Sequence, residues 1–191
     1  MIRAFIAVDL AAATIANIAT AIEQLKPRID AIRWVAPSNF HLTLKFLGDI
    51  DESRVEPIGA ALGDALRPFP RCTINAKGLG VFPGLKRPRV LWVGLEGPGL
   101  IPLAAQVESA LVPLGFAPDE RGFIPHLTIG RWRQGDRAGK TLEQELQCWA
   151  NYEFGISQAD EVILFQSVLN PAGAIYTRLK VIALEHERSV V

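Results

Sequence analysis

The sequence predicts a duplicated protein that mixes helices and strands, in which two similar lobes face one another across a cleft. The order strand, helix, turn and histidine-containing strand occurs twice along the chain. The two copies match in length, because His41 lies 38 residues after Arg3 and His126 lies 37 residues after Arg89. A solenoid needs three or more repeats to bury its core, so two copies favour lobes related by a pseudo-two-fold axis.

The first half begins with an apolar strand, followed by a helix whose apolar residues recur at helical spacing until Pro27 ends it. Turn residues separate the later segments from one another. The elements expected in this half are a strand at 2–9, a helix ending at Leu25, strands at 33–35 and 40–46, a helix at about 52–66 and a strand at about 72–82.

The second half repeats this pattern, with Leu100, Leu103, Val107 and Leu111 on one helical face. A turn over 118–120 precedes the second histidine strand. The elements expected in this half are a strand at 89–95, the helix through Leu111, a strand at 126–131, a helix at about 141–149, and strands at about 159–166 and 174–183.

Composition indicates a soluble globular protein, since 49% of the 191 residues are hydrophobic and 21% are charged. Twenty basic residues balance twenty acidic ones, whereas proteins that coat long nucleic acids have a basic excess. A nucleic-acid ligand would therefore be held at an end or at a single phosphate. Cys72 and Cys148 are too few for a disulfide framework and lack metal-ligand spacing. No run approaches the roughly 20 apolar residues of a membrane span, so we expect a cytoplasmic protein.

Two of the three histidines lie in the same four-residue frame, His41-Leu42-Thr43-Leu44 and His126-Leu127-Thr128-Ile129. Side chains alternate between the faces of a strand, so each histidine shares a face with its threonine. Leu42, Leu44 and Phe46 are expected on the opposite, buried face of the first strand, and Leu127 and Ile129 on that of the second. The duplication therefore predicts two imidazoles and two hydroxyls around one central space.

This set of groups suits hydrolysis of a phosphodiester. The reaction needs a base for the water proton and an acid for the departing oxygen, and imidazole, with a pKa near 6.5, can serve as either. Threonine hydroxyls can donate to the non-bridging phosphate oxygens. The scheme requires no metal or other cofactor, and the histidine-threonine spacing supplies only one good metal ligand per strand.

The segments around both motifs resemble the two-histidine phosphoesterases, and among them the LigT/ThpR-like RNA 2′,3′-cyclic phosphodiesterases, also called 2′-5′ RNA ligases. The segments with this resemblance are RAFIAVD at 3–9, WVAPSNFHLTLKFLG at 34–48, PHLTIGR at 125–131 and residues 167–176. The resemblance covers essentially the whole chain and implies one bilobal α+β domain over 1–191, with intertwined repeats at about 1–85 and 86–191. It further implies two antiparallel sheets lining a central cleft, with helices outside.

The resemblance also implies an activity, the hydrolysis of RNA 2′,3′-cyclic phosphate ends to 2′-phosphomonoesters. His41 and His126 become the acid/base pair, and Thr43 and Thr128 the phosphate anchors. Opening to a 2′-phosphate means that the 3′-oxygen leaves. We expect His41 to be the acid for this oxygen and His126 the base for water, although the reverse assignment stays open. Ligation of 2′-5′ ends in the same cleft is one alternative, and a non-catalytic RNA-end or nucleotide-binding module is another. A self-contained cleft favours a monomer without a protein partner.

Three further residues are candidates for substrate contacts. Arg131 could bind the phosphate if a twist or bulge near Gly130 brings it back to the face of His126, because strict alternation places it opposite. Lys45 is expected on the face of His41. Phe5 could stack on a terminal base, with core packing as the alternative.

Overall fold

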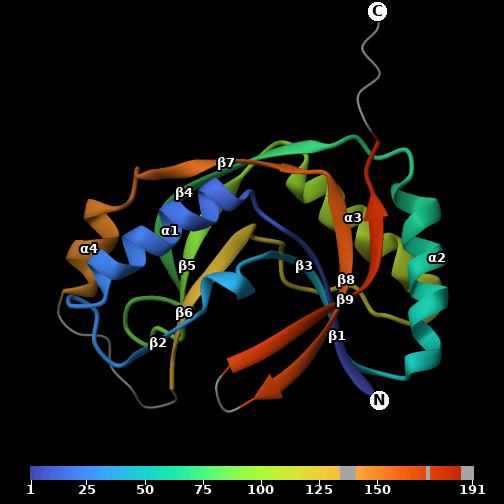
Figure 1. Ribbon diagram of the computed structural model, residues 1–191, viewed down its shortest axis with the longest axis horizontal. Helices are drawn as coiled ribbons and strands as arrows, with labels where there is room; N and C mark the ends of the chain where they lie inside the picture. The colour runs from blue at the N-terminus through green and yellow to red at the C-terminus, as the bar shows by residue number, and fades with distance from the viewer. Residues whose placement is uncertain (134–140, 171–172, 186–191) are drawn as a thin grey trace, which may run out of the picture.

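The computed structural model describes residues 1–133, 141–170 and 173–185, which form two antiparallel sheets with helices packed outside them (Figure 1). The first sheet has the order β3 (Leu42–Ile50), β1 (Ile2–Val8), β8 (Glu161–Asn170) and β9 (Gly173–Ala183). The second has the order β2 (Ile32–Trp34), β6 (His126–Trp132), β5 (Val90–Glu96), β4 (Cys72–Phe82) and β7 (Glu153–Ala159). This architecture confirms the predicted α+β class.

The helices pack on the sheets through the apolar residues that predicted them. In α3 (Leu100–Leu111), all four apolar residues at the expected spacing are buried. Leu25 and Ile18 of α1 (Ala12–Leu25) are also fully covered, as are Ile58 and Leu62 of α2 (Val55–Leu66). The fourth helix, α4, spans Leu142–Cys148. In Figure 1, α1 and α4 lie on the side of the second sheet, and α2 and α3 on the side of the first.

Each half of the chain contributes strands to both sheets. Strand β4 comes from the first half but pairs with β5, and β8 comes from the second half but pairs with β1. The three-strand orders β3-β1-β8 and β6-β5-β4 therefore correspond, with a histidine motif on the outer strand of each. Within the described residues, no helix has the length and apolar character needed to cross a bilayer.

The structure corrects the expected elements at three places. Strand β3 begins at Leu42 and continues to Ile50, because Leu42 is the first residue paired with β1 and Ile50 pairs with Ile2. Strand β7 was not expected from the sequence. Its seven residues include Gly155 and several polar side chains, which obscure the alternation that predicts a strand. The strand expected at 159–166 is β8, which begins at Glu161 and extends to Asn170.

Candidate active site

The two histidines occupy corresponding positions at the starts of two strands. His41 directly precedes β3, and His126 is the first residue of β6. The Nδ1 atom of His41 lies 2.8 Å from the carbonyl oxygen of Asn39, and that of His126 lies 2.7 Å from the carbonyl oxygen of Ile124. A carbonyl can only accept, so each Nδ1 must hold a hydrogen. Each Nε2 is left to exchange a proton with a substrate.

Aromatic rings surround each imidazole. The centroid of the His41 ring lies 4.8 Å from that of Phe5 and 5.2 Å from that of Tyr176, which meets it edge-on. His126 lies 5.0 Å from Phe82 and 6.3 Å from Trp92. These contacts restrict the rings and exclude water from their sides. Sequence reasoning did not identify Phe82 or Trp92 as neighbours of the site. The pairing of β5 with β6 brings Trp92 to the histidine motif, and the pairing of β4 with β5 brings Phe82.

Both imidazoles have pKa values below that of a free histidine. Burial lowers the pKa of His41 to about 4, against raising effects from the Asn39 carbonyl and Asp9, and the charges of Arg131 and His126 lower it further. The pKa of His126 is also lowered, first by burial and then by the charge of Arg131. The charge of Arg131 acts on both rings, so both lie within electrostatic reach of that guanidinium. The strong effect on His41 favours its neutral form in the free protein, which is the state of a general base.

Thr43 and Thr128 lie on the same strand faces as the histidines. Thr43 pairs with Ala7 of β1, and Thr128 pairs with Trp92 of β5. Both side chains are half-buried, and neither hydroxyl makes a hydrogen bond within the part of the chain that the structure describes. Both hydroxyls are therefore available to a ligand.

Arg131 joins this site because β6 contains a bulge. Leu91 pairs with Gly130 while Trp92 pairs with Thr128, so Ile129 is an extra residue in β6. Ile129 and Gly130 are consecutive buried residues, and the alternation resumes with Arg131 exposed. The charge of Arg131 lowers the pKa values of His41, His126 and Tyr176. The bulge thus brings a guanidinium within electrostatic reach of both imidazoles.

A matching bulge in β3 has the opposite consequence for Lys45. Ile6 pairs with Lys45 and Ala7 pairs with Thr43, so Leu44 is the extra residue. Lys45 is only 7% exposed, and its Nζ atom pairs with the Glu108 carboxylate and donates to the Ala117 carbonyl at 2.9 Å. The expectation that Lys45 shares the face of His41 is wrong, because the bulge turns it toward α3.

The same bulge turns Phe46 onto the site face, where strict alternation had placed it among the buried residues. Phe46 is 66% exposed, and its ring centroid lies 6.2 Å from that of Phe5. It stands five residues after His41, as Arg131 stands five residues after His126. Comparison of these two positions within the duplicated sequence could have identified Phe46 as a residue of the site.

Phe5 is packed beneath the site surface, so its ring is not exposed to a ligand. It is 3% exposed and stacks on Phe165 with centroids 5.2 Å apart, while Tyr176 covers its edge at 4.9 Å. Its packing matches the core alternative considered for it. The ring cannot stack on a base without rearrangement of its neighbours. Its contact with His41 instead helps to hold that imidazole in place.

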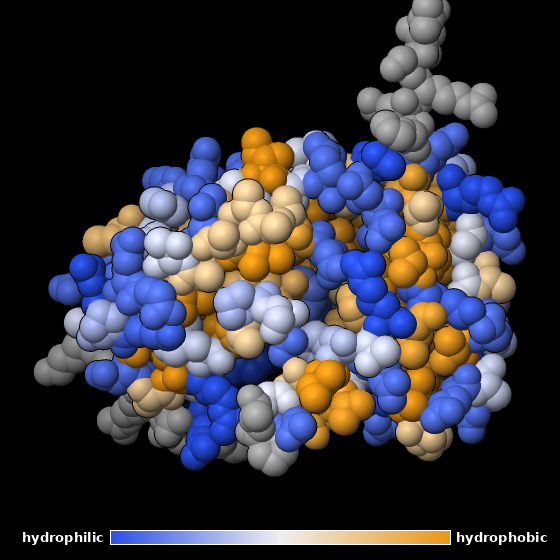
Figure 2. All heavy atoms as spheres, in the orientation of Figure 1, coloured by the Kyte–Doolittle hydropathy of each residue, from blue (hydrophilic) through white to orange (hydrophobic). Residues whose placement is uncertain are grey.

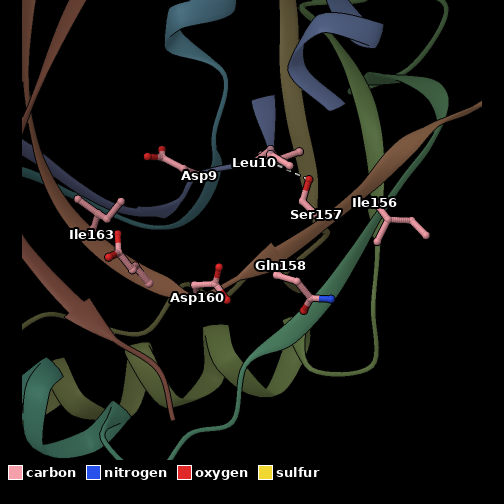
Figure 3. Close-up of a pocket in the computed structure, with 9 residues that line it drawn as sticks. Asp9, Leu10, Ile156, Ser157, Gln158, Asp160 and Ile163 are labelled. Atoms are coloured by element: carbon pink, nitrogen blue, oxygen red, sulfur yellow. Dashed lines mark hydrogen bonds between the residues drawn. The ribbon is translucent and has the colours of Figure 1, made fainter. Parts of the chain in front are cut away.

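The surface is hollowed near the centre of the face shown in Figure 2. A separate cavity of about 470 Å³ lies where β1 ends and α1 begins, against β7 and β8 (Figure 3). Carboxylates of Asp9, Asp160 and Glu161 line it. Asp9 and Glu161 pair with Arg178, and Asp160 pairs with Arg71. The acidic lining makes this cavity unsuitable for a phosphate, so Arg131 and the two histidine motifs remain the candidate phosphate site.

In the ranges the structure describes, no three His, Cys, Asp or Glu side chains are grouped so that they could hold a metal ion.

A family model described as "LigT like Phosphoesterase" matches the chain twice in tandem, over residues 8–92 and 93–176. Each match contains one histidine motif. An RNA 2′,3′-cyclic phosphodiesterase of Methanothermobacter thermautotrophicus is 37% identical over 184 residues, which cover 96% of this chain and 99% of that protein. A protein of the same name from Aquifex aeolicus is 39% identical over 161 residues, 81% of this chain and 85% of its own.

Solved structures agree with this relationship. A crystal structure of a Thermus thermophilus protein has a TM-score of 0.81 at 26% identity, covering 97% of this chain and all of its own. LigT of Escherichia coli, crystallised with 3′-AMP, has a TM-score of 0.76 at 28% identity, covering 96% of this chain and 98% of its own. The tandem sequence match, the near-full-length relatives and the paired strand orders agree, and the chain belongs to the LigT-like phosphoesterase family.

Proposed function

We propose that this protein hydrolyses RNA 2′,3′-cyclic phosphate ends to 2′-phosphomonoesters without a metal or other cofactor. The observation that supports this most directly is the matched pair of imidazoles, each held through Nδ1 by a backbone carbonyl two residues before it. Each presents Nε2 for proton transfer. The near-full-length relatives that bear the name RNA 2′,3′-cyclic phosphodiesterase support the choice of substrate.

The two imidazoles divide the proton transfers between them. One takes a proton from water as the water oxygen attacks phosphorus. The bond between phosphorus and the 3′-oxygen breaks, and the other imidazole protonates that oxygen, which leaves the phosphate on the 2′-oxygen. The base ends the turnover protonated and the acid ends it neutral, so exchange with solvent restores the starting state.

The pKa shifts bear on which histidine is the acid and which is the base. The sequence-based assignment made His41 the acid and His126 the base. In the free protein, however, burial holds the pKa of His41 at about 4, so His41 resists protonation. Burial lowers the pKa of His126 as well, but the effect on His41 is the larger. We therefore propose the reverse assignment, with His41 accepting the water proton and His126 protonating the leaving oxygen.

Thr43, Thr128 and Arg131 bind the phosphate in this proposal. The two hydroxyls donate to non-bridging oxygens, whose negative charge increases in the transition state. The Arg131 guanidinium offers donors in a planar fork that suits phosphate. Phe46 offers an exposed ring on the same face for the terminal base, the role that the sequence had suggested for Phe5.

The protein is proposed to act as a monomer in the cytoplasm. Every group assigned to the site comes from one chain, so no second subunit is needed to complete it. Cys72 and Cys148 are both free thiols, and Cys148 is exposed, which suits a reducing compartment.

The test is hydrolysis of a short RNA that ends in a 2′,3′-cyclic phosphate, followed by separation of 2′- and 3′-phosphate products. Wild type should give the 2′-phosphate, retain activity with excess chelator and show a bell-shaped dependence of kcat/KM on pH. His41→Ala and His126→Ala should each lose at least about 100-fold in kcat. A binding module would return the RNA unchanged. Retention of more than about a tenth of kcat in both variants would refute the acid/base roles.

A further inference from the structure

Arg33 lies directly opposite Arg131 on the neighbouring strand. Strand β2 is only three residues long, and its central residue, Arg33, pairs with Arg131 of β6. Residues directly opposite one another in an antiparallel pair project from the same face of the sheet. The two guanidinium groups therefore belong to one face, the face to which the bulge in β6 returns Arg131.

The residues beside Arg33 confirm the direction of its side chain. A Cβ atom on Gly130 would lie 2.3 Å from the Cδ1 atom of Ile32 and 3.6 Å from the ring of Trp34. Ile32 and Trp34 thus cover Gly130 on the side of the hydrophobic core, against which both pack. Arg33, between them in the strand, projects to the other side and is exposed.

This arginine pair lacks the acidic partners that some other arginines have. Arg28 pairs with Glu145 at 3.1 Å, and Arg178 pairs with Asp9 and Glu161. Across the described ranges, by contrast, neither Arg33 nor Arg131 forms an ion pair or side-chain hydrogen bond. Like charges directly opposite in a sheet destabilise it, and a bound anion between them would relieve the repulsion.

The order of the strands places Arg33 beyond Arg131, on the side away from β5. Strand β6 lies between β5 and β2, so Arg33 is on the far side of Arg131 from Trp92. A phosphate between the imidazoles lies within electrostatic reach of Arg131. An RNA chain that leaves the site along this edge would therefore meet Arg33 with its next phosphate.

We propose that Arg33 provides a second phosphate site beside the first. Arg131 binds the reacting phosphate, and Arg33, directly opposite it, binds the phosphodiester joining the terminal nucleotide to the rest of the RNA. This rests on the proposed function and adds a substrate preference to it. A cyclic mononucleotide has no such phosphodiester, so the arginine pair makes the protein prefer RNA chains of two or more nucleotides.

The test compares a 2′,3′-cyclic mononucleotide with a dinucleotide that ends in a 2′,3′-cyclic phosphate. Arg33→Gln should lower kcat/KM for the dinucleotide roughly tenfold more than for the mononucleotide, because it removes a charged phosphate contact. Arg67→Gln is the matched control, since Arg67 is an exposed arginine of the other lobe, following α2 and paired with Asp64. It should leave both substrates unchanged.

A neutral methylphosphonate at the internal linkage identifies the partner of Arg33. With this substrate, the kcat/KM of wild type should fall to that of the Arg33→Gln variant on the natural dinucleotide. The kcat/KM of the variant should change little. The proposal is overturned if wild type tolerates the methylphosphonate, or if Arg33→Gln affects both natural substrates equally, which would indicate support of Arg131 alone.

A binding assay separates this proposal from the proposed function. Fluorescence anisotropy with a labelled RNA ending in a 2′-phosphate needs no catalysis. Loss of one phosphate contact in Arg33→Gln should reduce the slope of log Kd against log salt by about 0.7. If the slope differs between wild type and Arg33→Gln as expected, but wild type hydrolyses no cyclic phosphate, the activity alone is refuted. Hydrolysis by wild type with an unchanged slope in Arg33→Gln would refute the second phosphate site alone.

Discussion

One backbone carbonyl helps to orient each catalytic candidate, beside the aromatic contacts. Asn39 presents its carbonyl to His41, and its side chain in turn donates to the Ala174 carbonyl of β9 at 2.8 Å. The imidazole is therefore tied to the neighbouring hairpin as well as to its own strand. Because Nδ1 donates to this carbonyl, Nε2 is the nitrogen that gains or loses a proton, as an acid/base pair requires.

At the same scale, the burial of His41 predicts sensitivity to acid. Its pKa is near 6.5 in the unfolded chain and about 4 in the folded one, so protons bind the unfolded state more tightly. The resulting stability is fully present above pH 6.5 and is lost as pH falls through 4. In urea denaturation at pH 7, 5.5 and 4, His41→Asn should lose less stability on acidification than wild type, by on the order of 2 kcal/mol. Identical pH dependence in the two proteins would contradict this account.

Two strands of the fold contain bulges at equivalent places, and these decide which side chains reach the site. The extra residues are Leu44 in β3 and Ile129 in β6, each three residues after a histidine. Each bulge moves the fifth residue after the histidine onto the site face. At these equivalent positions one half supplies a charge, Arg131, and the other an aromatic ring, Phe46.

Strand β4 supports the second histidine through a close contact between Gly80 and Trp92. A Cβ atom on Gly80 would lie 2.1 Å from the indole ring, so Gly80→Ala must displace Trp92, whose centroid is 6.3 Å from that of His126. We expect a loss of 1 to 3 kcal/mol in stability, at about the usual cost of overpacking, and a fall in kcat. Urea denaturation and steady-state kinetics measure the two effects.

Gly63→Ala is the control for this substitution. Gly63 lies inside α2 with no neighbour within 4 Å of the added methyl group. Alanine should therefore raise the stability by about 1 kcal/mol through helix propensity and leave kcat unchanged. An unaltered kcat in Gly80→Ala would show that the position of Trp92 does not matter to His126.

In the molecule as a whole, the two halves of the chain cannot complete their sheets alone. Strand β1 needs β8 from the second half, and β5 needs β4 from the first. Each half in isolation would expose a long sheet edge and part of its core. The two sheets are thus tied together by a chain that passes repeatedly from one to the other.

This exchange predicts that residues 1–85 and 86–191 do not fold separately but do so when combined. Circular dichroism and urea titration of each fragment should show no cooperative transition, whereas the mixture should regain one, together with activity. Cooperative unfolding of either fragment alone would show that the lobes are independent domains.

The sequence by itself determined the duplication, the helical faces and the pairing of each histidine with a threonine, because these depend on residue spacing within one element. Only the tertiary structure decided which neighbours those elements meet. Lys45 and Phe46 exchange faces because β3 must bulge to stay in register with β1, and Arg131 returns to the site for the same reason in β6. Register is a property of two strands at once, so Arg33 becomes part of the site only when β2 pairs with β6.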